Sequence, residues 1–150
     1  MTDRVYVDAN VIVYALDADA PFHRASLRFW QSVVGGDVRA ALSPQVLHES
    51  FVALTRRVAR PLEPTVVAES LLAILATPGL EVVVAGCMSA VEVFRLAAAR
   101  DVRGPGIYDV AHVAAMREHG IRRIATFNRR HFQGYDGIEP VEPGNGFPPG

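Results

Sequence analysis

The stretch Val5-Tyr6-Val7-Asp8-Ala9-Asn10 decides how this chain folds. Its first three residues continue a β-branched and aromatic run from Arg4, which is typical of a buried strand. The run stops at an acid, and a helical pattern follows directly. In open parallel sheets, ligands bind in the crevice at the carboxyl ends of the strands. Asp8 is therefore either the N-cap of the following helix or part of a binding site at that edge of the sheet.

Strand and helix patterns alternate along the rest of the chain. The further predicted strands cover residues 38–42, 80–85, 122–126 and 138–141, and the predicted helices cover residues 10–16, 22–34, 44–58, 65–76, 89–100 and 108–119. The β-branched run at 80–85 is typical of a buried strand. This alternation predicts an α/β fold, a three-layer α/β/α sandwich around a mainly parallel central sheet. We expect one domain over residues 1–142 and an irregular Pro- and Gly-rich tail over residues 143–150.

The composition is that of one globular domain. Half of the 150 residues are hydrophobic and 21% are charged, which is enough to bury a substantial core and argues against disorder. The formal net charge of −1 gives no global positive field of the kind that marks many nucleic-acid binders. All 15 basic residues are Arg, whose forked guanidinium suits phosphate, although genomic base composition also explains the absence of Lys. The single cysteine, Cys87, excludes an internal disulfide and is predicted to be a buried, unreactive thiol.

The sequence carries no pattern of a membrane or secreted protein. Residues 1–4 are polar and contain no apolar signal-peptide segment. The longest wholly apolar run, residues 71–76, is too short to cross a bilayer. We therefore expect a cytoplasmic protein without a membrane-spanning segment.

Two more acids occupy positions that packing alone does not explain. Glu49 interrupts an otherwise apolar helical stripe, and a Glu on a core-facing stripe needs a partner. Asp109 is predicted to open a helix after a Gly-Pro-Gly loop, where the helix N-terminus would stabilise the anion and lower its pKa. Polar residues Thr126 and Asn128 follow the next predicted strand. Taken separately, each acid could equally be a capping residue.

Taken together, the acids predict a cation site. Three carboxylates that converge on one crevice would repel each other strongly without a cation. Oxygen ligands select a hard divalent ion, Mg²⁺ or Mn²⁺, rather than zinc. Such an ion would hold an attacking water and neutralise the charge that develops on a phosphate.

The ordered set of motifs resembles the PIN domain and, more narrowly, the VapC toxins of bacterial type II toxin–antitoxin modules. The similarity runs from Val5 to about Val141, and the motifs that carry it are Val7-Asp8-Ala9-Asn10, Glu49 within its helix, Tyr108-Asp109 followed by Ala111 and Ala114-Ala115, and Thr126-Phe127-Asn128 with Phe132. The resemblance implies a metal-dependent endoribonuclease that is kept inactive by a cognate VapB antitoxin. It also implies a homodimer, with which the mean hydropathy of +0.18 is compatible.

By position, the resemblance also assigns the site. The residues that match the family's catalytic and metal-binding acids are Asp8, Glu49 and Asp109. Asn128 matches a fourth catalytic position, where many members carry an acid, and leaves the site one negative charge short. Asn10 and Thr126 match the positions that orient the first acid and a bound water.

Arginine and histidine side chains are further candidates for contacts with RNA or with a metal ion. Arg129 and Arg130 follow the last motif and are the favoured contacts for RNA phosphates. The arginines at 56–57 and 60 could serve the same purpose or lie on a solvated face. His112 lies one helical turn after Asp109, but the family pattern assigns no ligand there. We therefore expect His112 to be a surface residue or to lie behind the ligands.

Two functions from different classes follow from these motifs. The first is an active toxin in which metal-activated water hydrolyses the RNA phosphodiester bond without a covalent intermediate. The alternative is a degenerate PIN module that binds an antitoxin or RNA without cleaving it. Retention of all three acids favours the first function, and Asn128 is the one residue that favours the second.

Overall fold

The computed structural model describes residues 3–144. The elements in chain order are β1 (Arg4–Val7), α1 (Ala9–Leu16), α2 (His23–Val34), β2 (Arg39–Leu42), α3 (Pro44–Val52), a π-helical turn η1 (Ala53–Arg57), α4 (Pro64–Leu75), β3 (Leu80–Val82), α5 (Cys87–Ala99), α6 (Gly106–Glu118), β4 (Arg123–Ala125), α7 (Arg129–Phe132) and β5 (Glu139–Val141). Of the predicted irregular tail, only residues 143 and 144 fall within the described part of the chain, and the remainder lies outside it.

The central sheet is parallel throughout and has the strand order β3-β2-β1-β4-β5. Strand β1 is central because Val5 lies opposite Ala40 on one side and opposite Arg123 on the other. The chain winds from β1 outward through β2 to β3 and then returns to add β4 on the other side of β1. The order of strands therefore reverses beside β1, and such a reversal opens a crevice at the carboxyl ends of the strands.

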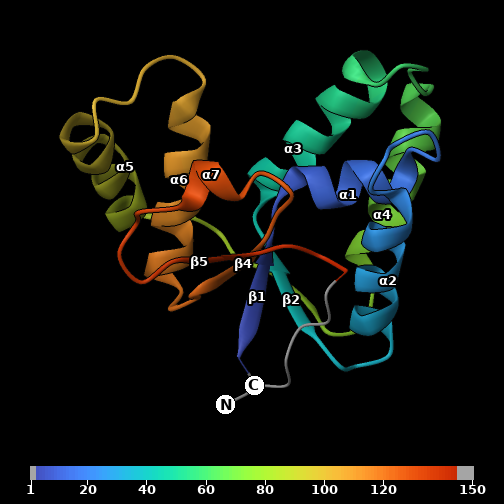
Figure 1. The fold of residues 1–150 in the computed structure, drawn as a ribbon, viewed down its shortest axis with the longest axis horizontal. Coiled ribbons are helices and arrows are strands. Elements are labelled where there is room, and N and C mark those ends of the chain that lie inside the picture. The colour runs from blue at the N-terminus through green and yellow to red at the C-terminus, as the bar shows by residue number, and fades with distance from the viewer. Residues whose placement is uncertain (1–2, 145–150) are drawn as a thin grey trace.

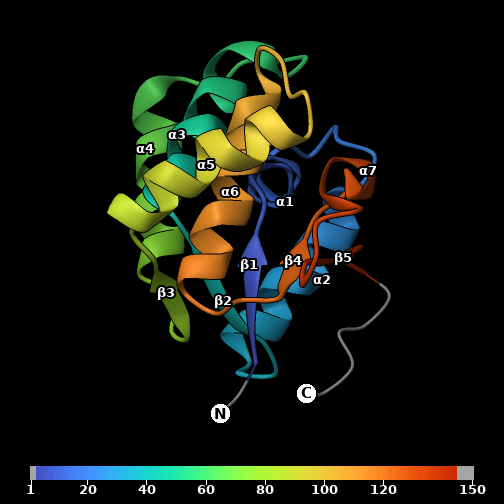
Figure 2. The same cartoon turned by 90° about the vertical axis from the view of Figure 1, so that its left-hand side faces the viewer.

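Helices cover both faces of this sheet. Helices α1, α2 and α4 lie on one side, and α5 and α6 lie on the other (Figure 1; Figure 2). The predicted three-layer α/β/α sandwich with a parallel sheet is therefore confirmed. Val5, Tyr6 and Val7 of β1 are each at most 1% exposed, so the central strand forms the middle of the core. No helix in residues 3–144 combines the length and apolar character needed to cross a membrane.

Three local expectations were wrong, each for reasons of tertiary position. Strand β3 is the exposed edge of the sheet rather than a buried strand, and it ends at Val82. Cys87 is exposed because it lies at the start of α5, which is buried only at Ser89. Helix α6 begins at Gly106, three residues before Asp109, so Asp109 lies within the first turn and does not cap the helix.

Candidate metal-dependent active site

Asp8 lies at the carboxyl end of β1, where the strand order reverses. It is 7% exposed, and its backbone nitrogen still donates to the carbonyl of Ala125 in β4, 3.0 Å away. Its Oδ1 accepts a hydrogen bond from the backbone nitrogen of Ala9 at 2.8 Å, so Asp8 does cap α1. The capping role uses only one carboxylate oxygen. Capping and a position in the crevice are therefore compatible.

The second oxygen of Asp8 is held by the two residues that were expected to orient it. Thr126 Oγ1 donates to Asp8 Oδ2 at 2.7 Å, and Asn10 Nδ2 donates to the same oxygen at 3.1 Å. Thr126 is completely buried and also accepts from the backbone nitrogen of Asn128 at 3.0 Å. Burial raises the pKa of Asp8, and the charge of His112 and the bond from Thr126 offset this only in part. Asp8 is thus a rigidly held carboxylate whose burial is offset only in part.

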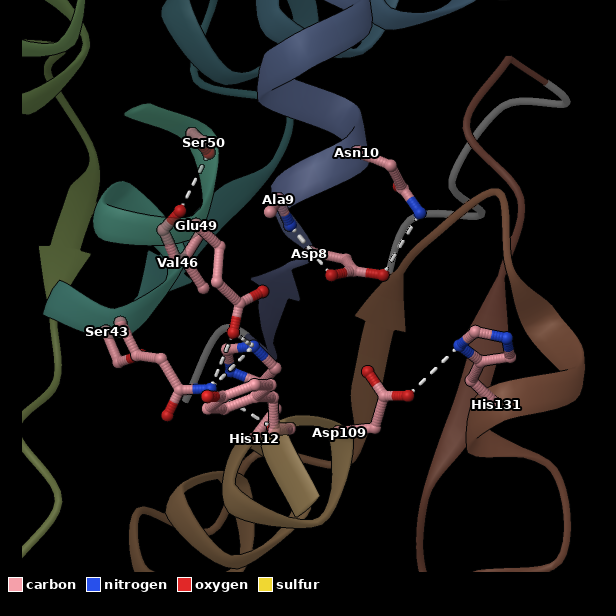
Figure 3. A network of polar contacts seen from close by, with 12 residues as sticks. Asp8, Ala9, Asn10, Ser43, Val46, Glu49, Ser50, Asp109, His112 and His131 are labelled. Atoms are coloured by element: carbon pink, nitrogen blue, oxygen red, sulfur yellow. Dashed lines mark hydrogen bonds and ion pairs between the residues drawn. The ribbon is translucent and has the colours of Figure 1, made fainter. Parts of the chain in front are cut away.

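Glu49 finds the partner that its place on an apolar stripe requires. The Nε2 atom of His112 lies 3.1 Å from Glu49 Oε1, and Gln45 Nε2 donates to the same oxygen at 2.6 Å. Burial acts to raise the pKa of Glu49, but His112 outweighs it, with help from Gln45 and Arg57, so that the pKa lies below its ordinary value. Figure 3 shows the Glu49 carboxylate turned toward His112. Glu49 is therefore held in its ionised form.

Behind Glu49, a chain of buried hydrogen bonds leads back into the sheet. The Tyr6 hydroxyl lies 2.8 Å from His112 Nδ1 and 2.7 Å from Ser43 Oγ. Since a carboxylate only accepts, the hydrogen on His112 Nε2 points toward Glu49. The Tyr6 hydroxyl thus joins His112 on one side to Ser43 on the other. Burial raises the pKa of Tyr6, which keeps its hydroxyl protonated as this arrangement requires.

Asp109 reaches the same region from the first turn of α6. Its Oδ2 lies 3.0 Å from His131 Nδ1, and the two side chains are 29% and 54% exposed. The expected decrease in the pKa of Asp109 was wrong: burial raises this pKa, and the charge of His131 offsets burial only in part. Asp109 lies inside the helix and does not cap it, so no capping hydrogen bond offsets its burial.

A cleft of about 1100 Å³ opens at this edge of the sheet. The expected site residues that line it are Asp8, Asn10, Glu49, Asp109 and Asn128. Thr126 lies buried directly behind Asp8. Arg129 and Arg130, the favoured RNA contacts, are exposed and do not line the cleft.

The donor set fits a divalent cation. One oxygen each of Asp8 and Glu49 and one ring nitrogen of His112 lie within 4.8 Å of one another. Asp109 is not part of this group, although its carboxylate faces the same space (Figure 3). Two carboxylates with a third nearby provide the hard oxygen ligands that Mg²⁺ and Mn²⁺ prefer. A cation bound beside Asp8 would offset the burial that raises the pKa of this carboxyl group.

His112 is 1% exposed and bonds Glu49, so it lies behind the ligands, one of the two positions expected for it. The one available signal was its place one turn after Asp109. Two residues that the sequence did not single out lie close to this network: Tyr6 contacts His112, and His131 contacts Asp109. Tyr6 has the pattern of an ordinary core residue of β1, and His131 stands outside the motifs that indicated the site. Neither gives a sequence signal.

Comparison with known proteins identifies the family. The PIN domain profile matches residues 5–138, which is most of the chain. The chain belongs to the PIN domain family. The resemblance seen in the motifs is therefore confirmed. No curated protein sequence matches this PIN domain.

Solved structures with the same fold include several toxins and toxin–antitoxin complexes. VapC20 of Mycobacterium tuberculosis, described as a toxin that cleaves the sarcin–ricin loop, is 20% identical with a TM-score of 0.72, over 93% of this chain and 99% of that one. VapBC2 of Rickettsia felis, bound to a promoter DNA fragment, is 14% identical with a TM-score of 0.68, over 92% and 97%. A FitAcB structure from Neisseria gonorrhoeae is 17% identical with a TM-score of 0.65, over 93% and 97%. At these identities the likeness establishes the fold.

Proposed function

We propose that this PIN domain is a metal-dependent endoribonuclease, the toxin of a type II toxin–antitoxin system. The observation that carries the proposal is the placement of Asp8, Glu49 and Asp109 around one cleft at the carboxyl edge of the sheet. A carboxylate cluster of this kind is suited to a cation that in turn binds a phosphodiester substrate. Cleavage rather than binding alone is therefore the function that these residues support better.

The side chains around the acids each have a definite task in this proposal. Asp8, Glu49 and Asp109 would hold Mg²⁺ or Mn²⁺. When bound, the ion would supply a water of lowered pKa and neutralise charge on the phosphate. Asn10 and Thr126 fix the orientation of Asp8 through its Oδ2. His112 fixes Glu49 through its Oε1 and keeps that carboxylate ionised.

The remaining polar groups extend this arrangement toward the substrate. Asn128 lines the cleft and offers a neutral amide where many relatives place an acid. Its backbone nitrogen donates to Thr126, which fixes the residue at the cleft, and its side chain does not cap α7. Asn128 would contact substrate or a water rather than hold a second ion.

The direct test is cleavage of RNA by the purified protein. Single-stranded RNA incubated with the protein and Mn²⁺ or Mg²⁺ should be cut internally, and EDTA in excess should stop the reaction completely. Cleavage that continues in EDTA would contradict metal dependence. Tight binding of RNA without cleavage in either metal would favour the degenerate module instead.

We further propose a VapB-type antitoxin and a second copy of the chain as partners. The solved structures with this fold include VapBC and FitAB complexes, which supports an antitoxin as a partner of this chain. Exposed apolar side chains support self-association, and those on and beside β3 and α5 are Val82, Val84, Met88, Val91 and Phe94. Light scattering at micromolar concentration should give about twice the chain mass of 16.3 kDa. A clean monomer would contradict the dimer.

A further inference from the structure

The helix that carries Glu49 changes its hydrogen-bond pattern just beyond that residue. Helix α3 passes into the π-helical turn η1, where the backbone nitrogen of Val58 donates to the carbonyl of Ala53, five residues back, at 3.1 Å. Leu54 is completely buried, and its carbonyl instead accepts from the backbone nitrogen of Leu62 at 2.9 Å. The wide turn is therefore anchored in the core. Single π-turns within α-helices are rare, and those that do occur are often found at functional sites.

This turn decides which arginine faces the cleft. In a regular α-helix, the eight residues from Glu49 to Arg57 would rotate by about 800°, which ends about 80° past two full turns. A turn with i→i+5 bonds takes more residues per revolution, so it reduces that offset and returns Arg57 toward the side of Glu49. Arg57 lines the cleft together with Glu49, whereas its neighbour Arg56 does not.

Among the described residues that line this cleft, Arg57 is the one arginine. The acids that line it are Asp8, Asp17, Asp19, Glu49 and Asp109. Asp19 is already paired with Arg60, whose Nη2 lies 2.6 Å from Asp19 Oδ2. In residues 3–144, no carboxylate forms an ion pair with Arg57, although its charge acts on Glu49 from a distance. Arg57 therefore presents an exposed guanidinium beside the acids with its hydrogen-bond donors available.

We propose that Arg57 binds a phosphate of the RNA strand beside Glu49, and that the π-turn serves to place it there. The inference rests on the proposed function in taking the polyanion to be RNA. A guanidinium offers two parallel donors to a phosphate, and it supplies the positive charge that a polyanion needs to enter an acidic cleft. The sequence offered Arg57 as one of several RNA contacts and favoured Arg129 and Arg130; of these three, Arg57 is the one that lines the cleft.

The test compares Arg57→Ala with Arg56→Ala, a matched control in the same turn. Binding of a fluorescein-labelled uridine RNA of about 12 nucleotides is followed by fluorescence anisotropy in EDTA, between about 50 and 200 mM salt. Arg57→Ala should weaken binding by about 10-fold to 100-fold at the lowest salt, as expected for one hydrogen bond to a charged group. The slope of log affinity against log salt should fall by about 0.7, the value for one lost contact to a single strand.

The control variants make the result specific. Arg56→Ala should leave both the affinity and the salt slope unchanged, and Arg57→Lys should restore the slope because it keeps the charge. Equal effects of Arg56→Ala and Arg57→Ala, an unchanged slope in Arg57→Ala, or no RNA binding by the wild type would each overturn the inference. Binding is measured without metal, so the result does not depend on cleavage. If only the proposed function is wrong, RNA will still bind in a way that depends on Arg57, but no metal will lead to its cleavage.

Discussion

Asp109→Asn should abolish RNA cleavage while leaving the metal-free protein as stable as the wild type or more stable. Removing one group that stabilises a charged transition state typically lowers kcat by about 100-fold to 1000-fold. Burial raises the pKa of Asp109, so its ionised form opposes folding at neutral pH. The variant also loses the pair with His131, but both side chains are partly exposed, and such pairs contribute little. No capping bond is lost, because the helix begins at Gly106.

The same substitution should remove the response to metal. In the wild type, Mg²⁺ at ten times its dissociation constant should add about 1.4 kcal/mol to the free energy of unfolding. For a chain of this length, that raises Tm by roughly 3–6 °C. Thermal melting of both proteins in EDTA and in Mg²⁺ measures the difference. Equal magnesium shifts in wild type and Asp109→Asn would mean that Asp109 does not hold the ion.

The stability difference between wild type and Asp109→Asn should depend on pH. A carboxylate with a raised pKa in the folded state binds protons more tightly there than in the unfolded chain, so the wild type gains stability as pH falls toward that pKa. The amide that replaces Asp109 in the variant cannot titrate. Any excess stability of the variant at pH 7 should therefore shrink as the pH is lowered. Denaturant unfolding at several pH values between neutral and about pH 4 tests this.

Glu49→Gln should also abolish cleavage but should destabilise the metal-free protein, the opposite of Asp109→Asn. The pKa of Glu49 is lowered by His112 despite burial, so the ionised carboxylate stabilises the fold at neutral pH. Gln can still accept the hydrogen bond from His112, but it loses the charge. A bond to a charged group is worth about 1 kcal/mol more than a neutral one, which for this length lowers Tm by roughly 2–4 °C.

For Glu49→Gln, the pH dependence of stability distinguishes loss of the charge from a packing defect. The stabilisation by Glu49 is present above its unfolded pKa of about 4.5 and is lost as pH falls through the lower folded value. The deficit of Glu49→Gln should therefore be full at pH 7 and should disappear in acid. A deficit that persisted unchanged in acid would indicate a packing defect. The two variants should change metal-free stability in opposite directions, whereas two substitutions that merely disturb packing would both lower it.

Sequence patterns predicted the frame of the site well because the relevant signals are local. The apolar run that ends at Asp8 and the helix that follows it are encoded in adjacent residues, and Asp8 and Glu49 do line the cleft as expected. Strand order is not local. The β-branched residues of β3 do not reveal that the strand lies at the edge of the sheet, so the prediction that it is buried was wrong.

Helix α6 shows why the contact of His112 with Glu49 could not be predicted. Its buried residues surround the helix and are Val110, His112, Val113, Ala114, Ala115 and Met116. With so little contrast between faces, periodicity does not reveal which way His112 points. The π-turn is invisible for a related reason, because five residues are too few to show a changed period. Arg57 and Arg56 are therefore equivalent in the sequence and differ only in the structure.

The buried hydrogen-bond chain from Ser43 through Tyr6 and His112 to Glu49 has a consequence for how such sequences can diverge. The two middle members, Tyr6 and His112, each make two of these bonds. Loss of the Tyr6 hydroxyl or of the His112 ring leaves a buried polar atom of a neighbour unsatisfied, at a cost of about 1–3 kcal/mol. Substitutions at positions 6, 43 and 112 are therefore tolerated as a set more easily than singly. In related sequences, these three positions should therefore be retained together or change together.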